Sequence, residues 1–194
     1  YLGASHSLPT AAYKRLVVDI GGGSTECIIG KRHVPQLTES LYMGCVSYTQ
    51  RFFPGGKVDK RRWREAQVAA ARQIQHIVQE YRQRGWKEAV GTSGTAKAIA
   101  DALEQNALNP GGEEGITWEG LARLSALLIK AGSAERLELR GLKADRLPVL
   151  AGCVVIMQAI FEAFALEHMV YADGALRLGV LYDQLGRFHQ HDMR

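Results

Sequence analysis

The sequence predicts an α/β fold with a mixed five-stranded sheet, helices on both faces and the element order βββαβαβα. Three segments with strand-like apolar patterns come first, and a run of glycines joins the first two. Strand-like and helical patterns then alternate along the rest of the chain. This alternation, after an opening set of strands, is typical of a sheet covered by helices.

Each expected element is bounded by Gly, Pro or polar capping residues, which begin and end helices and strands. We expect strands at Arg15 to Ile20, Thr25 to Lys31, Gln36 to Met43, Glu88 to Gly91 and His168 to Ala172. We expect helices at Val46 to Phe53, from a cap at Asp59 to Arg84, Thr95 to Leu103, from a cap at Thr117 to Ala131, Leu147 to Ala165, and Gly174 to Leu185.

The composition excludes several classes of protein. With 46% hydrophobic and 23% charged residues among 194, the chain has the make-up of a globular protein, not a disordered or fibrous one. A net charge of +4 favours anionic partners only mildly, and we expect no nucleic-acid partner. Cys27, Cys45 and Cys153 are far apart and form no CxxC motif, which predicts buried, reduced thiols in a cytoplasmic protein.

The most apolar segment is Leu147 to Leu166, which is just long enough to span a membrane. Gln158 and Glu162 interrupt it on one helical face. We therefore expect a buried core helix and no association with a membrane.

One stretch, LVVDIGGGSTECIIG, calls for a specific explanation, because consecutive glycines are costly to order. It is not a Walker A loop, since no Lys follows the glycines. It is not a dinucleotide fingerprint either, because Glu26 stands at the place of the last Gly and the residues after the turn form a strand instead of a helix. The glycines therefore lie in a hairpin.

A hairpin of this composition fits a phosphate site. Gly21, Gly22 and Gly23 can adopt positive φ and present backbone N–H groups to an anion, and Ser24 and Thr25 add hydroxyl donors. Asp19, at the end of the first strand, can hold Mg²⁺ directly or through water. Glu26 can orient or deprotonate an attacking water. The alternative is an ordinary glycine hairpin in which Asp19 bonds the turn.

Two later stretches can converge on the same cleft. In VGTSGTAKAIADAL, the residues Ser93, Gly94 and Thr95 open a helix, and their amides can form a second phosphate site. A plain helix cap explains the same residues. In YADGALRLGVLYDQL, Asp173 and Gly174 stand at a helix start, where capping and close packing are the favoured explanation.

Together, DIGGGSTE, SLYMGCV, GTSGTAKAIA and ADGALRLGVLYD, in this order and at this spacing, resemble the exopolyphosphatase and guanosine pentaphosphate phosphohydrolase family. That family is a branch of the actin-like ATPase superfamily, whose domains have a ribonuclease H-like fold. The resemblance covers nearly the whole chain. It departs at Leu178, where the family commonly has Glu after the Arg, so any role of that acid is in doubt here.

The resemblance implies that residues 1–194 are a single domain, the second actin-like domain of a longer protein. The first residue is Tyr1, which agrees with a piece of a longer chain. The first domain, which is itself an expected partner, a C-terminal helical region and the principal catalytic carboxylate just before Tyr1 would lie outside the piece. We therefore expect the isolated piece to be inactive and open to forming a homodimer.

The implied activity is hydrolysis of a terminal phosphoanhydride, with Mg²⁺ as cofactor and Asp19 and Glu26 as catalytic residues. The implied substrates are inorganic polyphosphate and the 5′-phosphate of guanosine pentaphosphate, which is converted to guanosine tetraphosphate in the stringent response. A nucleotide-binding switch or scaffold and a sugar-kinase-like phosphotransferase are the alternatives within the same superfamily.

Overall fold

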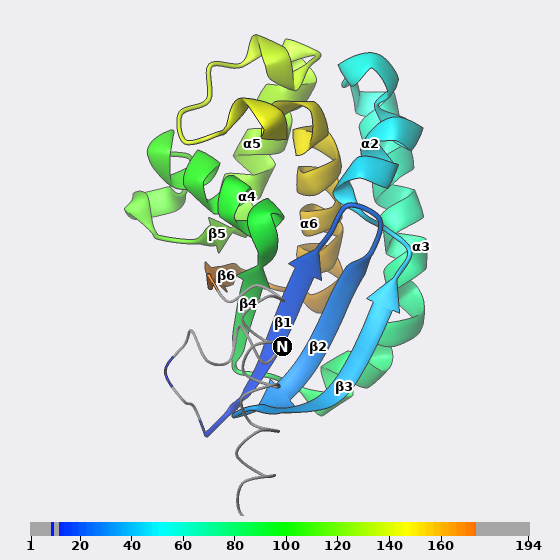
Figure 1. Cartoon of the computed structure of the whole chain (residues 1–194), viewed down its shortest axis with the longest axis vertical. Coiled ribbons are helices and arrows are strands. Elements are labelled where there is room, and N and C mark those ends of the chain that lie inside the picture. Colours follow the sequence, from blue (N-terminus) through cyan, green and yellow to red (C-terminus); the bar gives the residue numbers. More distant parts are fainter. Residues whose placement is uncertain (1–8, 10–11, 174–194) are drawn as a thin grey trace, which may run out of the picture.

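The computed structural model describes residue 9 and residues 12–173 (Figure 1). Its sheet has six strands in the order β3-β2-β1-β4-β6-β5. The strands are β1 Lys14–Ile20, β2 Thr25–Lys31, β3 Val34–Leu41, β4 Glu88–Thr92, β5 Ile116–Thr117 and β6 His168–Tyr171. The first three run antiparallel in sequence order, while β4 is parallel to β1 and β6 is parallel to β4. The predicted mixed sheet is confirmed.

The predicted number of five strands is wrong, because β5 adds a sixth strand at the edge, antiparallel to β6. Two residues are too few to show an alternating apolar pattern, so this strand is not readable from the sequence. Thr117 was predicted only as a helix cap. It performs both functions, because it pairs with His168 in the sheet and accepts a hydrogen bond from the amide of Gly120 at 2.9 Å.

The described α-helices are α2 Cys45–Phe52, α3 Lys60–Arg84, α4 Ser93–Gln105, α5 Trp118–Ala131 and α6 Leu150–Phe164. The predicted cap at Asp59 is confirmed by a hydrogen bond from the amide of Arg62 to its carboxylate at 2.8 Å. The predicted helix from Leu147 begins three residues late, because the 3₁₀ segment Ala144–Val149 contains Pro148, which has no N–H for a helical hydrogen bond. The last predicted helix, residues 174–185, lies outside the described residues.

One face of the sheet carries the main core. Leu16, Val18 and Ile20 alternate along β1, are fully or almost fully buried, and belong to one hydrophobic cluster that includes side chains from each of the described α-helices. Figure 1 shows α3 and α6 behind the sheet on this side. Because successive strand residues point to opposite faces, Val17 and Asp19 project from the other face. This alternation separates the candidate site from the core.

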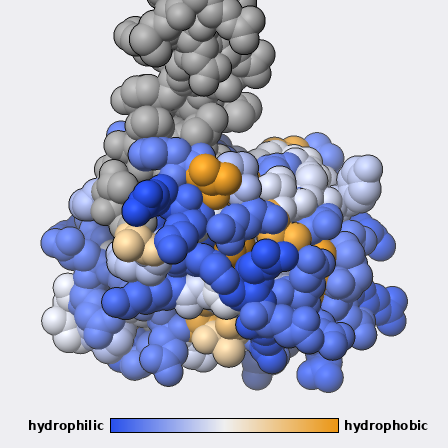
Figure 2. Space-filling view, turned by 90° about the horizontal axis from the view of Figure 1, so that it is seen from below, coloured by the Kyte–Doolittle hydropathy of each residue, from blue (hydrophilic) through white to orange (hydrophobic). Residues whose placement is uncertain are grey.

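Helix α6 runs through the centre of the core, and only Glu162 and Ala163 among its residues are not buried. The segment Ala144–Phe164 has the length and hydropathy of a membrane span, but 72% of its most apolar window is buried within the protein. The prediction of a core helix is confirmed. On the face seen from below, most of the coloured surface is polar, and hydrophobic residues form only small separate patches (Figure 2).

The polar residue in the middle of α6 completes a buried hydrogen-bond network. Gln158 accepts a hydrogen bond from the indole Nε1 of Trp63 at 3.0 Å. Its amide nitrogen donates to the carbonyl of Leu121 at 3.2 Å and to Oγ of Ser125 at 2.9 Å. A buried amide with its partners satisfied in this way ties α3, α5 and α6 together without leaving a polar group unpaired.

Candidate active site

Two carboxylates lie side by side where β1 and β2 meet their connecting turn. Asp19 is directly opposite Glu26 in the antiparallel register, and Thr92 of β4 is its partner on the other side. Directly opposed residues project from the same face, with Cβ atoms about 4.5–5.5 Å apart. The structure therefore brings together the two residues predicted to be catalytic.

Asp19 is held in a half-buried environment. Burial raises the pKa of its carboxyl group above the ordinary value, and the negative charge of Glu26 acts in the same direction. The polar hydroxyls of Thr92 and Ser93 lie nearby and oppose this shift in pKa, because they favour the charged carboxylate. A cation placed between the two carboxylates would relieve their repulsion.

Glu26 is oriented by two serine hydroxyls. Ser24 Oγ donates to Glu26 Oε1 at 2.7 Å, and Ser40 Oγ of β3 donates to the same oxygen at 2.9 Å. Among the described residues no donor bonds Oε2, so this oxygen is left to face a substrate or water. Sequence reasoning missed Ser40; the only signal was the strand register, which places it opposite Glu26.

Hydrogen bonds from the first turn of helix α2 fix the orientation of the glycine turn. The carbonyl of Gly21 accepts a hydrogen bond from the amide of Cys45 at 2.9 Å. The carbonyl of Gly22 accepts from the amides of Val46 and Ser47 at 3.0 and 3.1 Å. In a trans peptide the N–H points opposite to the C=O, so the amides that follow these carbonyls, those of Gly22 and Gly23, point away from α2. Both glycines are exposed, and among the described residues no carbonyl accepts from their amides.

The reason predicted for the glycines is only partly right. None of Gly21, Gly22 and Gly23 has positive φ, and the amide of Gly21 is taken up by the carbonyl of Ser24 at 2.9 Å. The turn itself imposes a steric demand at Gly44 instead. A Cβ there would stand 2.4 Å from the carbonyl carbon and oxygen of Gly22 and from the nitrogen of Gly23. The sequence signal for this contact was a Gly at a helix start, which reads as an ordinary cap.

The hydroxyls of two residues in the predicted phosphate-binding set do not face the site. The Thr25 side chain is fully buried, and its hydroxyl donates to the carbonyl of Met43 at 2.6 Å. Thr95 is 2% exposed and faces the thiol of Cys153, whose Sγ is 4.0 Å from its hydroxyl oxygen. Both hydroxyls point into the core, where no phosphate can reach them. Their neighbours Ser24 and Ser93 are partly exposed.

The second predicted phosphate turn meets the first at Asp19. Ser93 begins α4 with φ of 78°, a strained value for a residue with a side chain. Its hydroxyl donates to the carbonyl of Ile20 at 3.2 Å, which fixes this turn against the end of β1. Gly94 is covered by a guanidinium: a Cβ there would be 2.5 Å from Nη2 of Arg146. Sequence reasoning missed Arg146, because only folding brings it to the start of α4.

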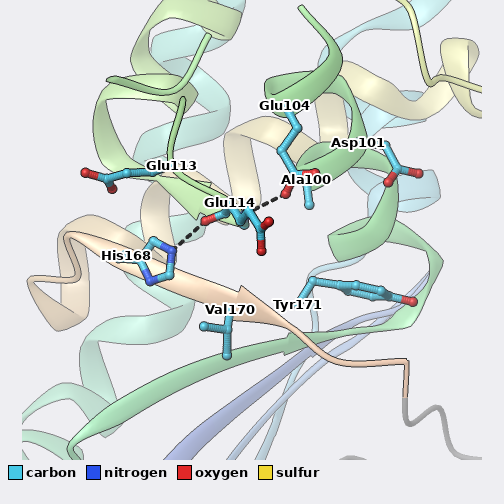
Figure 3. Close-up of a pocket in the computed structure, with 9 residues that line it drawn as sticks. Ala100, Asp101, Glu104, Glu113, Glu114, His168, Val170 and Tyr171 are labelled. Atoms are coloured by element: carbon cyan, nitrogen blue, oxygen red, sulfur yellow. Dashed lines mark hydrogen bonds between the residues drawn. The ribbon is translucent and has the colours of Figure 1, made fainter. Parts of the chain in front are cut away.

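A hollow with a volume of about 580 Å³ lies elsewhere, between α4 and β6 (Figure 3). Its lining includes the acidic residues Asp101, Glu104, Glu113 and Glu114. Glu104 accepts from the amide of Gly115 at 2.6 Å, and the ring Nε2 of His168 lies 2.8 Å from the carbonyl of Glu114. These carboxylates repel phosphates, so this hollow is a poorer candidate for a phosphate site than the glycine turn.

Replacing Asp19 by asparagine is expected to raise the free energy of unfolding at neutral pH. Because the pKa of Asp19 is raised by folding, the native state binds its proton more tightly, and stability falls as the pH rises from the ordinary value of 3.8 through the folded value. Asparagine removes this penalty while keeping the size of the side chain and an oxygen atom. Urea denaturation at several pH values measures the difference, which should shrink towards pH 3.8. A variant less stable than the parent at pH 7 would contradict it.

Fold and motifs together define an α/β domain of the actin-like ATPase class. Residues 1–188 match the model of the Ppx/GppA phosphatase family. The chain belongs to this family, which confirms the resemblance found in the sequence motifs.

Several known proteins are similar along nearly the whole chain. A Haemophilus influenzae protein, provisionally named an exopolyphosphatase, is 39% identical over 194 residues, which are 100% of this chain and 59% of its own length. A guanosine-5′-triphosphate,3′-diphosphate pyrophosphatase of Aeromonas hydrophila is 39% identical over 180 residues, 93% of this chain and 36% of its own length. The crystal structure of the Aquifex aeolicus member of the Ppx/GppA family superposes with a TM-score of 0.78 at 26% identity, covering 96% of this chain and 60% of that one. The chain thus spans between about a third and three fifths of these relatives.

Proposed function

We propose that this chain is one domain of a longer phosphoanhydride hydrolase. The enzyme would remove the terminal phosphate of inorganic polyphosphate or the 5′-phosphate of guanosine pentaphosphate. The observation that carries the proposal is the pair Asp19 and Glu26 beside the outward amides of Gly22 and Gly23. The names of the relatives from Haemophilus influenzae and Aeromonas hydrophila support it.

In this mechanism the glycine turn binds the phosphoryl group that is transferred. The amides of Gly22 and Gly23 donate to its oxygens, and the start of α4, with Arg146 close by, binds the adjoining phosphate. Phosphoryl transfer needs little covalent chemistry from the protein, so positioning and charge stabilisation carry most of the rate enhancement. The Ser24 hydroxyl is engaged with Glu26 and contributes through that carboxylate.

Glu26 is the residue placed to position the attacking water. Ser24 and Ser40 hold Oε1, so Oε2 can accept a proton from a water that approaches the phosphorus in line. The resemblance implies a further carboxylate from a preceding segment. In the proposed enzyme a first domain would supply that carboxylate and complete the active site.

The residues present fit Mg²⁺. The described residues contain no group of three or more His, Cys, Asp or Glu side chains that could enclose a metal ion. Mg²⁺ on phosphate substrates usually takes only one or two protein carboxylates and completes its shell with water and phosphate oxygens. Asp19 is the carboxylate that would hold it, directly or through water. Bound there, Mg²⁺ would neutralise charge on the phosphate oxygens.

The cellular setting follows from the same proposal. The enzyme would work in the cytoplasm, where its three cysteines stay reduced, and would meet polyphosphate or guanosine pentaphosphate there. The described residues include no disulfide, and all three cysteines are buried. Association into a homodimer is part of the proposal as well.

A phosphate-release assay on the complete protein tests the proposal. With Mg²⁺ present, we expect release from polyphosphate, from guanosine pentaphosphate or from both, while the 194-residue chain alone releases little. Tight binding of ATP without phosphate release would indicate a switch or scaffold instead. Transfer of phosphate to a sugar would indicate a kinase-like enzyme. Full activity of the isolated chain would mean that no carboxylate from another segment is needed.

A further inference from the structure

A groove between α2 and α3 combines an apolar floor with a basic rim. Its volume is about 480 Å³. The floor includes Phe52, the last residue of α2, and Val68 of α3, whose exposed fraction is 45%. The rim carries four guanidinium groups, those of Arg51, Arg61, Arg64 and Arg72. The groove therefore offers apolar surface and concentrated positive charge side by side.

Three of these guanidinium groups form no hydrogen bond or ion pair with any described residue. Only Arg61 is paired, with Glu65 one turn along α3, at 2.8 Å. Arg64 and Arg72 are exposed, and Arg51 lies over the ring of Phe52, with Cζ 4.9 Å from the ring centroid. Positive groups gathered in this way repel one another, so an acidic partner would lower the electrostatic energy of the groove.

The charges at the start of α3 are not explained by the stability of the helix. The N-terminal end of a helix carries a partial positive charge and favours acidic side chains. The first turn of α3 has none and begins instead with Lys60, Arg61 and Arg62. Arg62 is paired with the capping Asp59 at 3.1 Å, but exposed pairs of this kind stabilise a helix only slightly. Binding of an acidic partner explains the excess of positive charge better.

The spacing of the groove residues on α3 matches that of a second helix. Arg64, Val68 and Arg72 follow one another at intervals of four residues, and all three line the groove. Arg64 and Arg72 are therefore about 12 Å apart along the helix axis. A helix lying beside α3 covers the same distance in eight residues and presents side chains four residues apart on one face. An acidic, an apolar and an acidic residue at these intervals would meet the three in turn.

We propose that this groove binds an acidic amphipathic helix of a partner protein. Its Asp or Glu side chains pair with Arg64 and Arg72, and an apolar side chain between them packs on Val68 and Phe52. The apolar floor favours this partner over a bare polyanion, because a chain of phosphates has no apolar group with which to cover the floor. An amphipathic helix lying in a groove is a recurring mode of recognition. The proposal requires neither the glycine turn nor the proposed catalytic function.

Binding of a synthetic peptide to the 194-residue chain tests the proposal. The probe is a fluorescein-labelled peptide of about 18 residues, five helical turns, with Leu on one helical face and Glu on the others. Fluorescence anisotropy measures its dissociation constant. A peptide of the same composition in scrambled order keeps the charge and loses the apolar face. It should bind at least tenfold more weakly than the amphipathic peptide.

The Arg64→Glu variant tests the rim of the groove. It should weaken binding of the amphipathic peptide at least tenfold, because it replaces an attraction by a repulsion. The matched control is Arg140→Glu, which makes the same change of charge at an exposed position outside the groove. Its dissociation constant should lie within about twofold of the parent value. Urea denaturation of both variants confirms that each is folded.

The Val68→Ser variant tests the floor without a change of charge. It should weaken binding of the amphipathic peptide about three- to tenfold, because part of an apolar side chain is no longer buried. If Val68→Ser bound as tightly as the parent and inorganic polyphosphate displaced the peptide, the groove would be a site for polyanions and the proposal would be wrong. Equal binding of the scrambled peptide, or no binding of the amphipathic peptide up to about 1 mM, would also overturn it.

Discussion

Replacing Glu26 by glutamine is expected to slow phosphate release by the complete protein about 100- to 10,000-fold, the usual contribution of a general base. Glutamine keeps the size of the side chain and an oxygen that can accept from Ser24 and Ser40. It cannot accept a proton from water at neutral pH. The loss should therefore fall on the turnover number, with a much smaller change in KM.

The matched control for this experiment is Glu80→Gln, which removes the same charge from an exposed position on α3. Its turnover should equal that of the parent protein. Urea denaturation of both variants separates chemistry from folding, because Glu26→Gln is expected to keep nearly the parent stability. Turnover within a few-fold of the parent would remove Glu26 from the mechanism, and equal losses in both variants would point to a general effect of charge.

Replacing Gly44 by alanine is expected to lower the free energy of unfolding by about 1–3 kcal/mol, the range found for overpacked sites. The added Cβ would stand 2.4 Å from three backbone atoms of Gly22 and Gly23, and backbone atoms cannot rotate out of the way as a flexible side chain does. The glycine turn must then separate from α2. Urea denaturation of the 194-residue chain measures the stability, and phosphate release by the complete protein should fall with it.

Gly23→Ala is the control that distinguishes this contact from a general sensitivity of the glycine run. A Cβ at Gly23 meets nothing within 4 Å, and its φ is not in the left-handed region. Its stability should therefore lie within about 0.5 kcal/mol of the parent. If Gly44→Ala proved as stable as Gly23→Ala, the packing of the turn against α2 would not be what fixes the turn.

Local patterns in the sequence were sufficient for most of the secondary structure. The caps at Asp59 and Thr117 were predicted correctly, because a side-chain oxygen that accepts from an amide three residues later is a local interaction. The two-residue strand at Ile116 was missed, because its strand geometry comes entirely from pairing with His168 and Met169, about 50 residues away. Strands this short have no signal of their own.

The parts of the candidate site that depend on neighbouring residues were also predicted from the sequence. The hairpin and its two carboxylates were predicted, since Asp19 and Glu26 lie within ten residues of one another, while the register that sets them opposite each other comes from the structure. The direction of a hydroxyl at the end of a strand is not encoded in this way. Thr25 was expected to face a ligand and instead bonds Met43 inside the core, because that face of the sheet is the one the helices cover.

The sequence by itself determined the family, the order of the main strands and helices, and the pair of carboxylates beside a bare backbone turn. These features depend on residue type and on spacings of a few positions, so they can be recognised in the sequence without the tertiary structure. Only the tertiary structure decided which amides of the turn face outward, that Arg146 covers Gly94, and that Gly152 of α6 packs against the carbonyl of Cys45. These depend on helices distant in the chain packing against one another, and close packing fixes such contacts through the whole core at once.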